Sequence, residues 1–265
     1  MDSPLIALMS DFGLDDFFVP SLKAVILSLN RVARIVDITH TVPSYDVRAA
    51  GFILAGCCSF FPKGTIFLAV VDPGVGSDRK VLLARTDKYD FIAPDNGLLT
   101  LALDGAAGLE LRSVSNPKYF LSRSSRTFEG RDRMAPAAAW LSLGAPPSEF
   151  GPRLDDYKKL AIRPARMVKG AVIGEVAYVD KFGNLITNIP VSLLNEIKLG
   201  TKRGLRLRVK GRAIGSFLES YSQGRPGQPF GLAGSLGTVE IAVREASAAA
   251  RLKAGPGDEV QIAAG

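Results

Sequence analysis

The chain has 265 residues, of which 47% are hydrophobic and 22% are charged, and its formal net charge is +7. This balance is ordinary for a globular protein, and no segment approaches the ~20 uninterrupted apolar residues of a membrane helix, so no membrane partner is expected. The two cysteines, Cys57 and Cys58, are adjacent within an apolar segment, which favours reduced core residues and predicts a cytoplasmic protein.

The first half of the chain alternates strand-like and helix-like segments. Strands are expected at residues 4–10, 33–39, 64–72, 80–87 and 89–95, and helices at residues 19–30, 47–61 and 133–144. The segment GTIFLAVVD, residues 64–72, is apolar almost throughout, as is typical of strands in a parallel sheet that is covered on both faces. The pattern predicts a mostly parallel α/β sandwich domain over residues 1–160.

The pattern changes near residue 151. Residues 151–170 are polar, contain prolines and show little periodicity, which predicts a linker. Mostly strands are expected after it, at residues 171–180, 184–190, 204–211, 238–245 and 258–265. Short strands of this kind predict a smaller C-terminal domain over residues 161–265, all-β and barrel-like.

The densest group of basic residues lies at residues 201–212, within this second domain. There Leu205, Leu207 and Val209 alternate with basic residues, which is the period of a strand with one face in solvent. The segment contains no aromatic side chain that could stack on a base. A solvated strand face is favoured, and nucleic-acid binding is kept only as a minor alternative.

Polar residues follow four of the strands expected in the first domain. Asp11, His40, Asp72 and the pair Asp95–Asn96 each come directly after such a strand, and ligands of open parallel sheets bind beyond the carboxyl ends of the strands. Each residue alone fits a helix cap or a turn, but together they predict a ligand-binding rim. His40 is the only histidine, so a zinc site is not expected, and a structural hydrogen bond is the favoured role for it.

Six segments occur in an order that resembles one protein family. They are MSDFGLDD at residues 9–16, IVDITHTVPSYDV at 35–47, VVDPGVGSDRK at 70–80, APDNGLLT at 93–100, TFEGRDRMAPAAA at 127–139 and DKFGNLITNI at 180–189. Each segment alone is a weak signal, but six in order are specific. The chain resembles the S-adenosylmethionine hydroxide adenosyltransferases, which are relatives of the fluorinase and chlorinase enzymes.

The resemblance implies a hydrolase that uses S-adenosyl-L-methionine as substrate and needs no metal or other cofactor. Water or hydroxide would attack the 5′ carbon of the ribose, giving adenosine and L-methionine. A sulfonium is already a good leaving group, so the protein must mainly align the reacting atoms and polarise the water. The resemblance also implies a homotrimer, in which the N-terminal domain of one subunit and the C-terminal domain of the next form each site.

The family motifs assign a set of substrate-binding residues. By resemblance, Asp11 would hold the ribose hydroxyls, Asp180 the methionine ammonium group and Asn184 the adenine edge. Ser235 would contact the methionine or the adenine portion. Tyr45 would place its ring against the ribose or the sulfonium, although core packing fits this residue nearly as well. The full expected set is Asp11, Tyr45, Asn96, Asp180, Phe182, Asn184 and Ser235.

Asp72 and Arg79 match two members of the water-activating Asp-Arg-His trio of the hydrolases in this family. The third position holds Glu129 in place of histidine. Glu129 either points into the site beside Asp72 as a third catalytic residue, one carboxylate then acting as general base and the other as an orienting acid, or turns away to pair with Arg131 or Arg133 at the surface. Retention of Asp72 and the absence of the long fluorinase insertion favour water as the nucleophile. A halide adenosyltransferase and a non-catalytic sensor of S-adenosylmethionine or adenosine are the alternatives.

Overall fold

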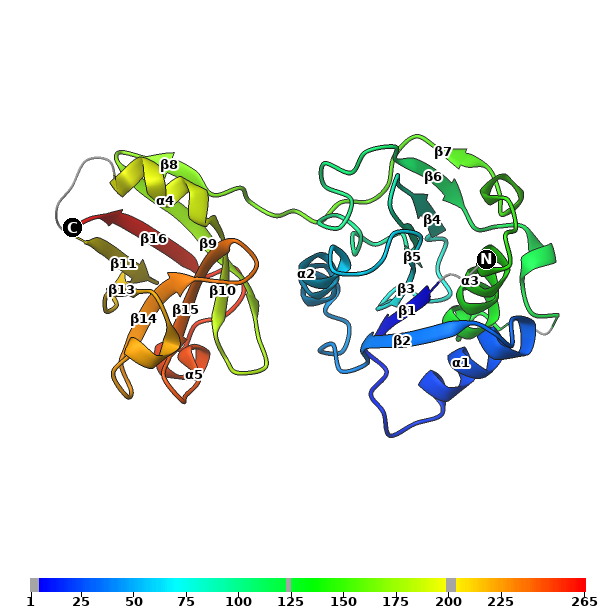
Figure 1. Ribbon diagram of the computed structural model, residues 1–265, viewed down its shortest axis with the longest axis horizontal. Coiled ribbons are helices and arrows are strands. Elements are labelled where there is room, and N and C mark those ends of the chain that lie inside the picture. The colour runs from blue at the N-terminus through cyan, green and yellow to red at the C-terminus, as the bar shows by residue number, and fades with distance from the viewer. Residues whose placement is uncertain (1–4, 123–124, 199–203) are drawn as a thin grey trace. The chain divides into compact units, whose positions relative to one another are not determined.

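The computed structural model describes residues 5–122, 125–198 and 204–265. The chain divides into two compact units, Met1–Leu160 and Ala161–Gly265 (Figure 1). Each unit has its own sheet and its own hydrophobic core. In the part of the chain that the structure describes, no helix has the length and apolar character needed to cross a membrane.

The first unit is built on a seven-stranded sheet in the order β2-β1-β3-β5-β4-β6-β7. The strands are β1 (Leu5–Ser10), β2 (Arg34–Thr39), β3 (Ile66–Val70), β4 (Val81–Arg85), β5 (Asp90–Pro94), β6 (Glu110–Ser113) and β7 (Arg153–Leu154). The helices are α1 (Phe18–Leu29), α2 (Val47–Cys58) and α3 (Ala135–Ser142), and a five-residue π-helix, Gly130–Met134, precedes α3. The α/β class expected from the sequence is confirmed.

The strands of this sheet are less uniformly parallel than predicted. β2, β1, β3 and β5 pair in parallel, as expected. β4 pairs antiparallel with both β5 and β6, and β6 pairs antiparallel with β7, so the sheet is mixed. The apolar sequence of β4 indicates burial on both faces, and it says nothing of strand direction. Only a tight turn, closed by the Thr86 amide donating to the Tyr89 carbonyl at 2.9 Å, separates β4 from β5, and such a turn cannot hold a parallel crossover.

The core of the first unit explains why β1 and β3 are apolar along their whole length. Ile6 and Leu8 of β1 pack in one cluster with Leu22 and Ile26 of α1 and with the alanines of α3. The intervening residues of β1 are also fully buried, and α2 packs against this strand as well. Because side chains alternate between the two faces of a strand, a strand covered by helices on both faces is apolar throughout.

The second unit is strand-rich and curls into a half-barrel (Figure 1). Its sheet has the order β12-β11-β16-β9-β10-β15-β14-β13, and β8 pairs with β9. The strands are β8 (Arg166–Val168), β9 (Ala171–Val179), β10 (Leu185–Pro190), β11 (Leu205–Val209), β12 (Arg212–Ala213), β13 (Phe217–Leu218), β14 (Pro229–Ala233), β15 (Thr238–Val243) and β16 (Glu259–Ala264). The expected predominance of strands is confirmed.

This unit also contains two short helices, so the expectation of an all-β domain is wrong in detail. They are α4 (Val191–Lys198) and α5 (Ala248–Leu252). Leu194 and Ile197 of α4 have helical spacing and are buried in the core of the unit. α5 begins at a regular cap, where the Ser247 hydroxyl accepts a hydrogen bond from the Ala250 amide at 3.0 Å, the usual role of serine at this position.

The predicted linker, residues 151–170, is only partly a linker. Its two ends contribute the edge strands β7 and β8. Between them, the Lys158 amide donates to Asp95 Oδ1 at 2.7 Å, and the Leu160 amide donates to Thr100 Oγ1 at 2.8 Å. These bonds hold the segment against the first unit up to Leu160, which is the last residue of that unit.

The basic segment agrees with its predicted pattern where it is described; residues 201–203 lie outside the described residues. In β11, Leu207 and Val209 are buried, whereas Arg206 and Arg208 are exposed. The alternation therefore belongs to a strand with one solvated face.

The loop that follows β3 is closed by one of its own side chains and by a distant segment. The Ser77 hydroxyl donates to the Gly74 carbonyl at 2.7 Å, and Arg126 Nη2 donates to the Gly76 carbonyl at 2.7 Å. Gly76 has φ of +81°, and a Cβ atom there would lie 2.9 Å from the Arg126 carbonyl oxygen. Glycine is therefore required at this position both by the backbone conformation and by the close approach.

We predict that Gly76→Ala lowers the free energy of unfolding by more than Gly105→Ala does. Gly105 also has positive φ, +64°, but a Cβ atom there would meet nothing within 4 Å. Alanine at residue 105 should cost about 1–2 kcal/mol for the left-handed backbone alone. Gly76→Ala should cost a further ~1–3 kcal/mol for the steric conflict. Urea unfolding of both variants measures the difference, and equal costs would contradict the close approach.

Candidate active site

The parallel strands bring the predicted rim residues to one edge of the first sheet. Asp11 follows β1, and Asp72 follows β3 after one intervening residue. Both line a cavity of about 340 Å³, together with Tyr45, Phe128 and Glu129. The expectation that the first and third strand ends contribute to one hollow agrees with this geometry, because β1 and β3 are parallel neighbours.

The other rim residues have protein partners and do not line this cavity. His40 Nδ1 lies 2.7 Å from the Ser10 hydroxyl, which is the structural hydrogen bond expected for it. Asp95 accepts the Lys158 amide. Asn96, expected to bind substrate, donates from Nδ2 to the Val71 carbonyl at 2.8 Å. Its amide therefore fixes the backbone directly before Asp72.

A chain of alternating charges begins at Asp72. Arg79 Nε donates to both Asp72 carboxylate oxygens, at 2.8 and 2.7 Å, and Arg79 Nη2 donates to Asp72 Oδ2. The same Nη2 donates to Glu129 Oε2 at 2.5 Å. Glu129 Oε1 accepts Arg133 Nη1 at 2.5 Å. The order Asp72, Arg79, Glu129, Arg133 thus alternates negative and positive groups, which sum to zero charge.

Burial makes this chain of ion pairs strongly interacting. The Asp72, Arg79 and Glu129 side chains are only 6%, 8% and 7% exposed. Burial alone would lower the pKa of Arg79, but its hydrogen bond and charge interaction with Asp72, together with the Glu129 carboxylate, more than offset this and raise that pKa. Arg79 is therefore a permanent cation between two carboxylates.

Glu129 was expected either to point into the site or to pair with Arg131 or Arg133, and in the structure it does both. Its carboxylate is buried, lines the cavity and contacts Arg79. The other carboxylate oxygen pairs with Arg133, which was the partner expected only if Glu129 turned to the surface. Arg131 pairs instead with the buried Asp132.

Tyr45 lies at the mouth of the cavity, where Asp11 fixes its backbone. Asp11 Oδ2 accepts the Tyr45 amide at 2.8 Å, and Tyr45 has φ of +66°. The tyrosine side chain is largely exposed, since the residue is 72% accessible. Core packing, the alternative considered for Tyr45, is therefore wrong.

An aromatic wall that the sequence reasoning missed completes the cavity. Phe12 and Phe18 lie against Phe128, with ring centroids 5.6 and 5.1 Å away and edge-to-face geometry. All three residues line the cavity. Phe12 directly follows Asp11 and Phe128 directly precedes Glu129, so their adjacency to predicted site residues was the available signal; Phe18 lies seven residues after Asp11.

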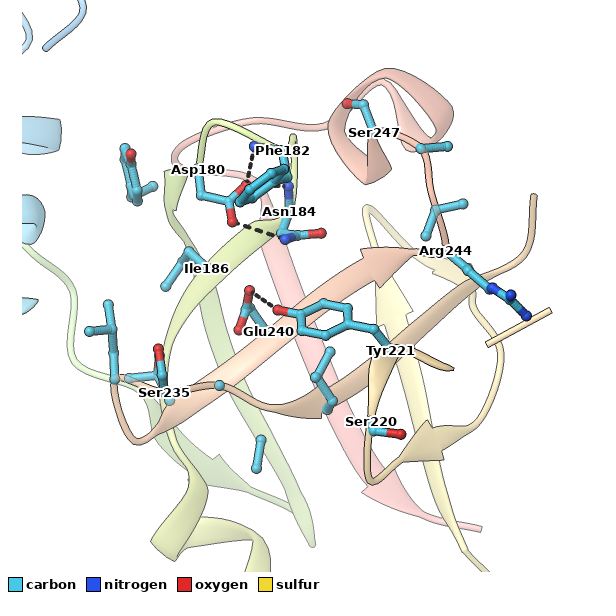
Figure 2. A pocket seen from close by; sticks show the side chains of 18 of the residues that line it. Asp180, Phe182, Asn184, Ile186, Ser220, Tyr221, Ser235, Glu240, Arg244 and Ser247 are labelled. Carbon is cyan, nitrogen blue, oxygen red and sulfur yellow. Dashed lines mark hydrogen bonds between the residues drawn. The ribbon is translucent and has the colours of Figure 1, made fainter. Parts of the chain in front are cut away.

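The second unit has a larger cavity, of about 1140 Å³, which brings together the four site residues predicted there: Asp180, Phe182, Asn184 and Ser235 (Figure 2). Asp180 Oδ1 accepts the amides of Phe182 and Asn184, at 2.9 and 2.8 Å, and Asp180 Oδ2 accepts Asn184 Nδ2 at 2.9 Å. The Phe182 residue is 79% exposed. Asp180 thus shapes the loop that presents Phe182 and orients the Asn184 amide.

A hydrogen-bonded pair in this cavity, between Tyr221 and the buried Glu240, was not predicted. The Tyr221 hydroxyl donates to Glu240 Oε1 at 2.8 Å (Figure 2). Burial raises the pKa of Glu240, the Tyr221 hydrogen bond opposes this, and the nearby Asp180 charge raises it further. Burial and the Glu240 carboxylate raise the pKa of Tyr221 as well. Glu240 interrupts the apolar run TVEIAV, and a charged residue inside an apolar strand was the available signal.

The chain thus has an α/β unit with a charged cavity at its strand ends and a strand-rich unit with a second, mostly apolar cavity that holds a few polar groups, which is typical of small-molecule sites. Residues 6–151 match the model of the SAM hydroxide adenosyltransferase N-terminal domain, and residues 174–261 match that of the C-terminal domain. The chain belongs to the S-adenosylmethionine hydroxide adenosyltransferase family.

Individual relatives agree with this assignment. The chain is 34% identical to the (R)-S-adenosyl-L-methionine hydrolase of Salinispora arenicola over 99% of both chains. It is 30% identical to a fluorinase of Actinoplanes sp., over 79% of both chains. A crystal structure of an uncharacterized conserved protein from Thermotoga maritima superposes with a TM-score of 0.90 and is 38% identical, covering 97% of this chain and 99% of that one.

We predict that Glu240→Gln stabilises the protein increasingly as the pH rises. Because the pKa of Glu240 is raised in the folded state, the stability that its protonated form contributes is present below the ordinary glutamate pKa and is lost as the pH rises through the folded pKa. Glutamine stays neutral and can still accept the Tyr221 hydroxyl. The unfolding free energy of the variant should therefore exceed that of the parent by a margin that grows between pH 4 and pH 8.

Urea unfolding at several pH values measures this margin. Glu245→Gln, which changes an exposed carboxylate, is the control for the loss of one negative charge. A margin for Glu240→Gln that stays constant with pH would contradict the burial argument.

Proposed function

We propose that this protein hydrolyses S-adenosyl-L-methionine to adenosine and L-methionine. The observation that carries the proposal is the buried Asp72–Arg79 pair, in which Asp72 lines a cavity at the carboxyl end of β3. The hydrolase relative, which aligns with nearly the whole chain, supports the same activity.

In the proposed reaction, Asp72 orients the attacking water. The oxygen of that water forms a bond with the ribose 5′ carbon, the bond from that carbon to sulfur breaks, and its electron pair stays on methionine as a neutral thioether. The water proton passes to Asp72 and then to solvent. Since the sulfonium leaves without protonation, the protein needs no acid and no metal to assist it, and catalysis consists mainly of alignment.

Arg79 keeps the Asp72 carboxylate in place for this role. Its Nε contacts both carboxylate oxygens, and the Gly74 amide donates to Asp72 Oδ1 at 3.2 Å. A carboxylate held on several sides loses little further freedom on reaching the transition state, which is the advantage of a fixed polar site. Glu129, whose oxygens are each held by an arginine, acts by holding Arg79.

The remaining predicted residues bind the substrate in this proposal. Asp11 accepts the ribose hydroxyls, and the exposed ring of Tyr45 lies against the sugar or the sulfonium, which an aromatic face attracts. Asp180 meets the ammonium group of methionine. Asn184, whose amide is oriented by Asp180, pairs with the adenine edge, which needs both a donor and an acceptor.

Phe182 and Ser235 complete the proposed binding set. The exposed Phe182 ring provides an apolar face for the base, and Ser235 provides a hydroxyl to the methionine or adenine portion. Asn96 holds the backbone before Asp72, and the substrate contact expected for it stays a prediction.

A halide adenosyltransferase is the second candidate, because a fluorinase is also among the relatives. Asp72 argues against it. A carboxylate at the position of the nucleophile repels a halide anion, and this repulsion is strong where water is excluded. The same carboxylate accepts a hydrogen bond from water, so the residues favour water.

Each unit holds only part of the proposed site residues, which supports a site that is completed by association of subunits. Asp11, Asp72 and Arg79 belong to the first unit, and Asp180 and Asn184 to the second. We propose a homotrimer, as the family resemblance implies, in which each site combines residues of two subunits.

Light scattering should give the mass of three chains. Co-expressed Asp72→Asn and Asp180→Asn chains should regain activity that each variant lacks alone, because mixed assemblies would contain sites with both native halves. A monomer with full activity would contradict the trimer.

The activity itself is tested by incubating the protein with S-adenosyl-L-methionine, with and without chloride, and identifying products by mass spectrometry. Adenosine and methionine are expected in both cases. 5′-Chloro-5′-deoxyadenosine would support the halide reaction instead, and bound but unreacted substrate would support a sensor.

Asp72→Asn in the same assay should lower turnover by about 10²–10⁴-fold, the usual contribution of a general base. Asp78→Asn, which removes an exposed carboxylate from the same loop, is the matched control and should retain parental turnover. Loss of turnover in both variants would indicate a general effect on the loop and remove Asp72 from its assigned role.

A further inference from the structure

Arg133 is the last member of the chain of charges, and it does not line the cavity. Its guanidinium lies behind Glu129, where it is held on three sides. Nη1 donates to Glu129 Oε1 at 2.5 Å, and Nη2 donates to the Val114 carbonyl at 3.1 Å. The guanidinium carbon also lies 4.8 Å from the centre of the Phe120 ring. These contacts fix the position of a positive charge. The Asp-Arg-His trio that the family resemblance implies contains no counterpart of this second arginine.

The local backbone brings Glu129 and Arg133 together. They are four residues apart, and the intervening chain forms the π-helix Gly130–Met134, a local widening that often occurs at functional sites. A Cβ atom at Gly130 would lie 3.0 Å from Val70 Cγ1 at the end of β3. The glycine therefore lets the helix begin close to the strand that delivers Asp72, and this places the Glu129 carboxylate against Arg79.

Charge balance gives Arg133 a specific purpose. A neutral histidine at residue 129 would leave Asp72 and Arg79 as a neutral pair. Glu129 adds a buried negative charge, and a buried charge without a partner is costly. Arg133 restores neutrality, and it occupies the Glu129 oxygen that Arg79 does not contact.

We infer that Arg133 is a positioning residue for the reaction, acting through Glu129. Arg133 holds Glu129, Glu129 holds Nη2 of Arg79, and Arg79 holds the Asp72 carboxylate against the attacking water. Glutamate at residue 129 then performs the orienting work of the family histidine only because arginine is present at residue 133. This inference rests on the proposed hydrolysis.

The inference predicts a separation of kinetic constants. Arg133→Met removes the charge and keeps an unbranched side chain of similar length. Because Arg133 lies outside the cavity, KM for S-adenosyl-L-methionine should change by less than about threefold. Turnover should fall by about 10- to 100-fold, the scale expected when catalytic groups are slightly misplaced. Arg133→Lys keeps the charge and should recover part of the loss.

The decisive test repeats the change in a second background. In Glu129→His there is no carboxylate for Arg133 to hold, so adding Arg133→Met should change turnover by less than about twofold. Arg85→Met is the matched control. It removes a partly exposed arginine–carboxylate pair, with Asp90, at the start of β5, which is the strand end opposite to the one near Asp72, and it should leave turnover unchanged. Circular dichroism and thermal unfolding establish that each variant is folded.

The outcomes separate the two proposals. A parent protein without hydrolysis would overturn the proposed function, and the inference with it. An active parent with unchanged turnover in Arg133→Met would overturn only the inference. An equal loss from Arg133→Met in both backgrounds would also overturn it, because Arg133 would then support the fold and not Glu129. A loss confined to the Glu129 background is the result expected.

Discussion

The candidate site depends on one run of ion pairs, from Asp72 through Arg79 and Glu129 to Arg133. It joins the loop after β3 to the first turn of the helical segment that leads into α3, and the Val114 carbonyl extends it to the end of β6. Removing charged groups from water is expensive, and buried ion pairs often contribute little net stability. Their value here is geometric, since each charged group has a fixed partner and the first one, Asp72, lines the cavity.

The sequence predicted most of the elements whose own apolar periodicity shows which of their faces are buried. β1, α1, α2 and β3 lie where periodicity placed them, because each buries one face or both faces. β2 also lies where it was expected, although it is an edge strand with no fully buried residue. Strand direction was not accessible in the same way. β4 looks like its parallel neighbours in composition, and only the length of the turn before β5 reveals that it runs the other way. α4, which directly follows β10, was missed although Pro190 marks the boundary between the two elements.

The site could be predicted where its contacts are local or repeat a family motif. Asp72 and Arg79 are seven residues apart within one loop, and their pairing follows from that loop closing on itself. The partners of Glu129 could not be chosen from sequence, because Arg79 lies 50 residues away and only the folded structure shows that one carboxylate reaches two arginines. The hydrogen bond between Tyr221 and Glu240 was not predicted for the same reason, because it joins two segments that are separated in sequence.

The backbone of Tyr45 has a consequence for how a ligand would be received. A tyrosine with φ of +66° occupies a region that side-chain-bearing residues rarely adopt, at a cost of about 1–3 kcal/mol. The Asp11 carboxylate stabilises this conformation by accepting the Tyr45 amide. The backbone that carries the ring is thus fixed before any ligand is present. If Tyr45 contacts the substrate as proposed, association loses less conformational entropy than it would with a mobile loop, and part of the affinity is decided when the chain folds.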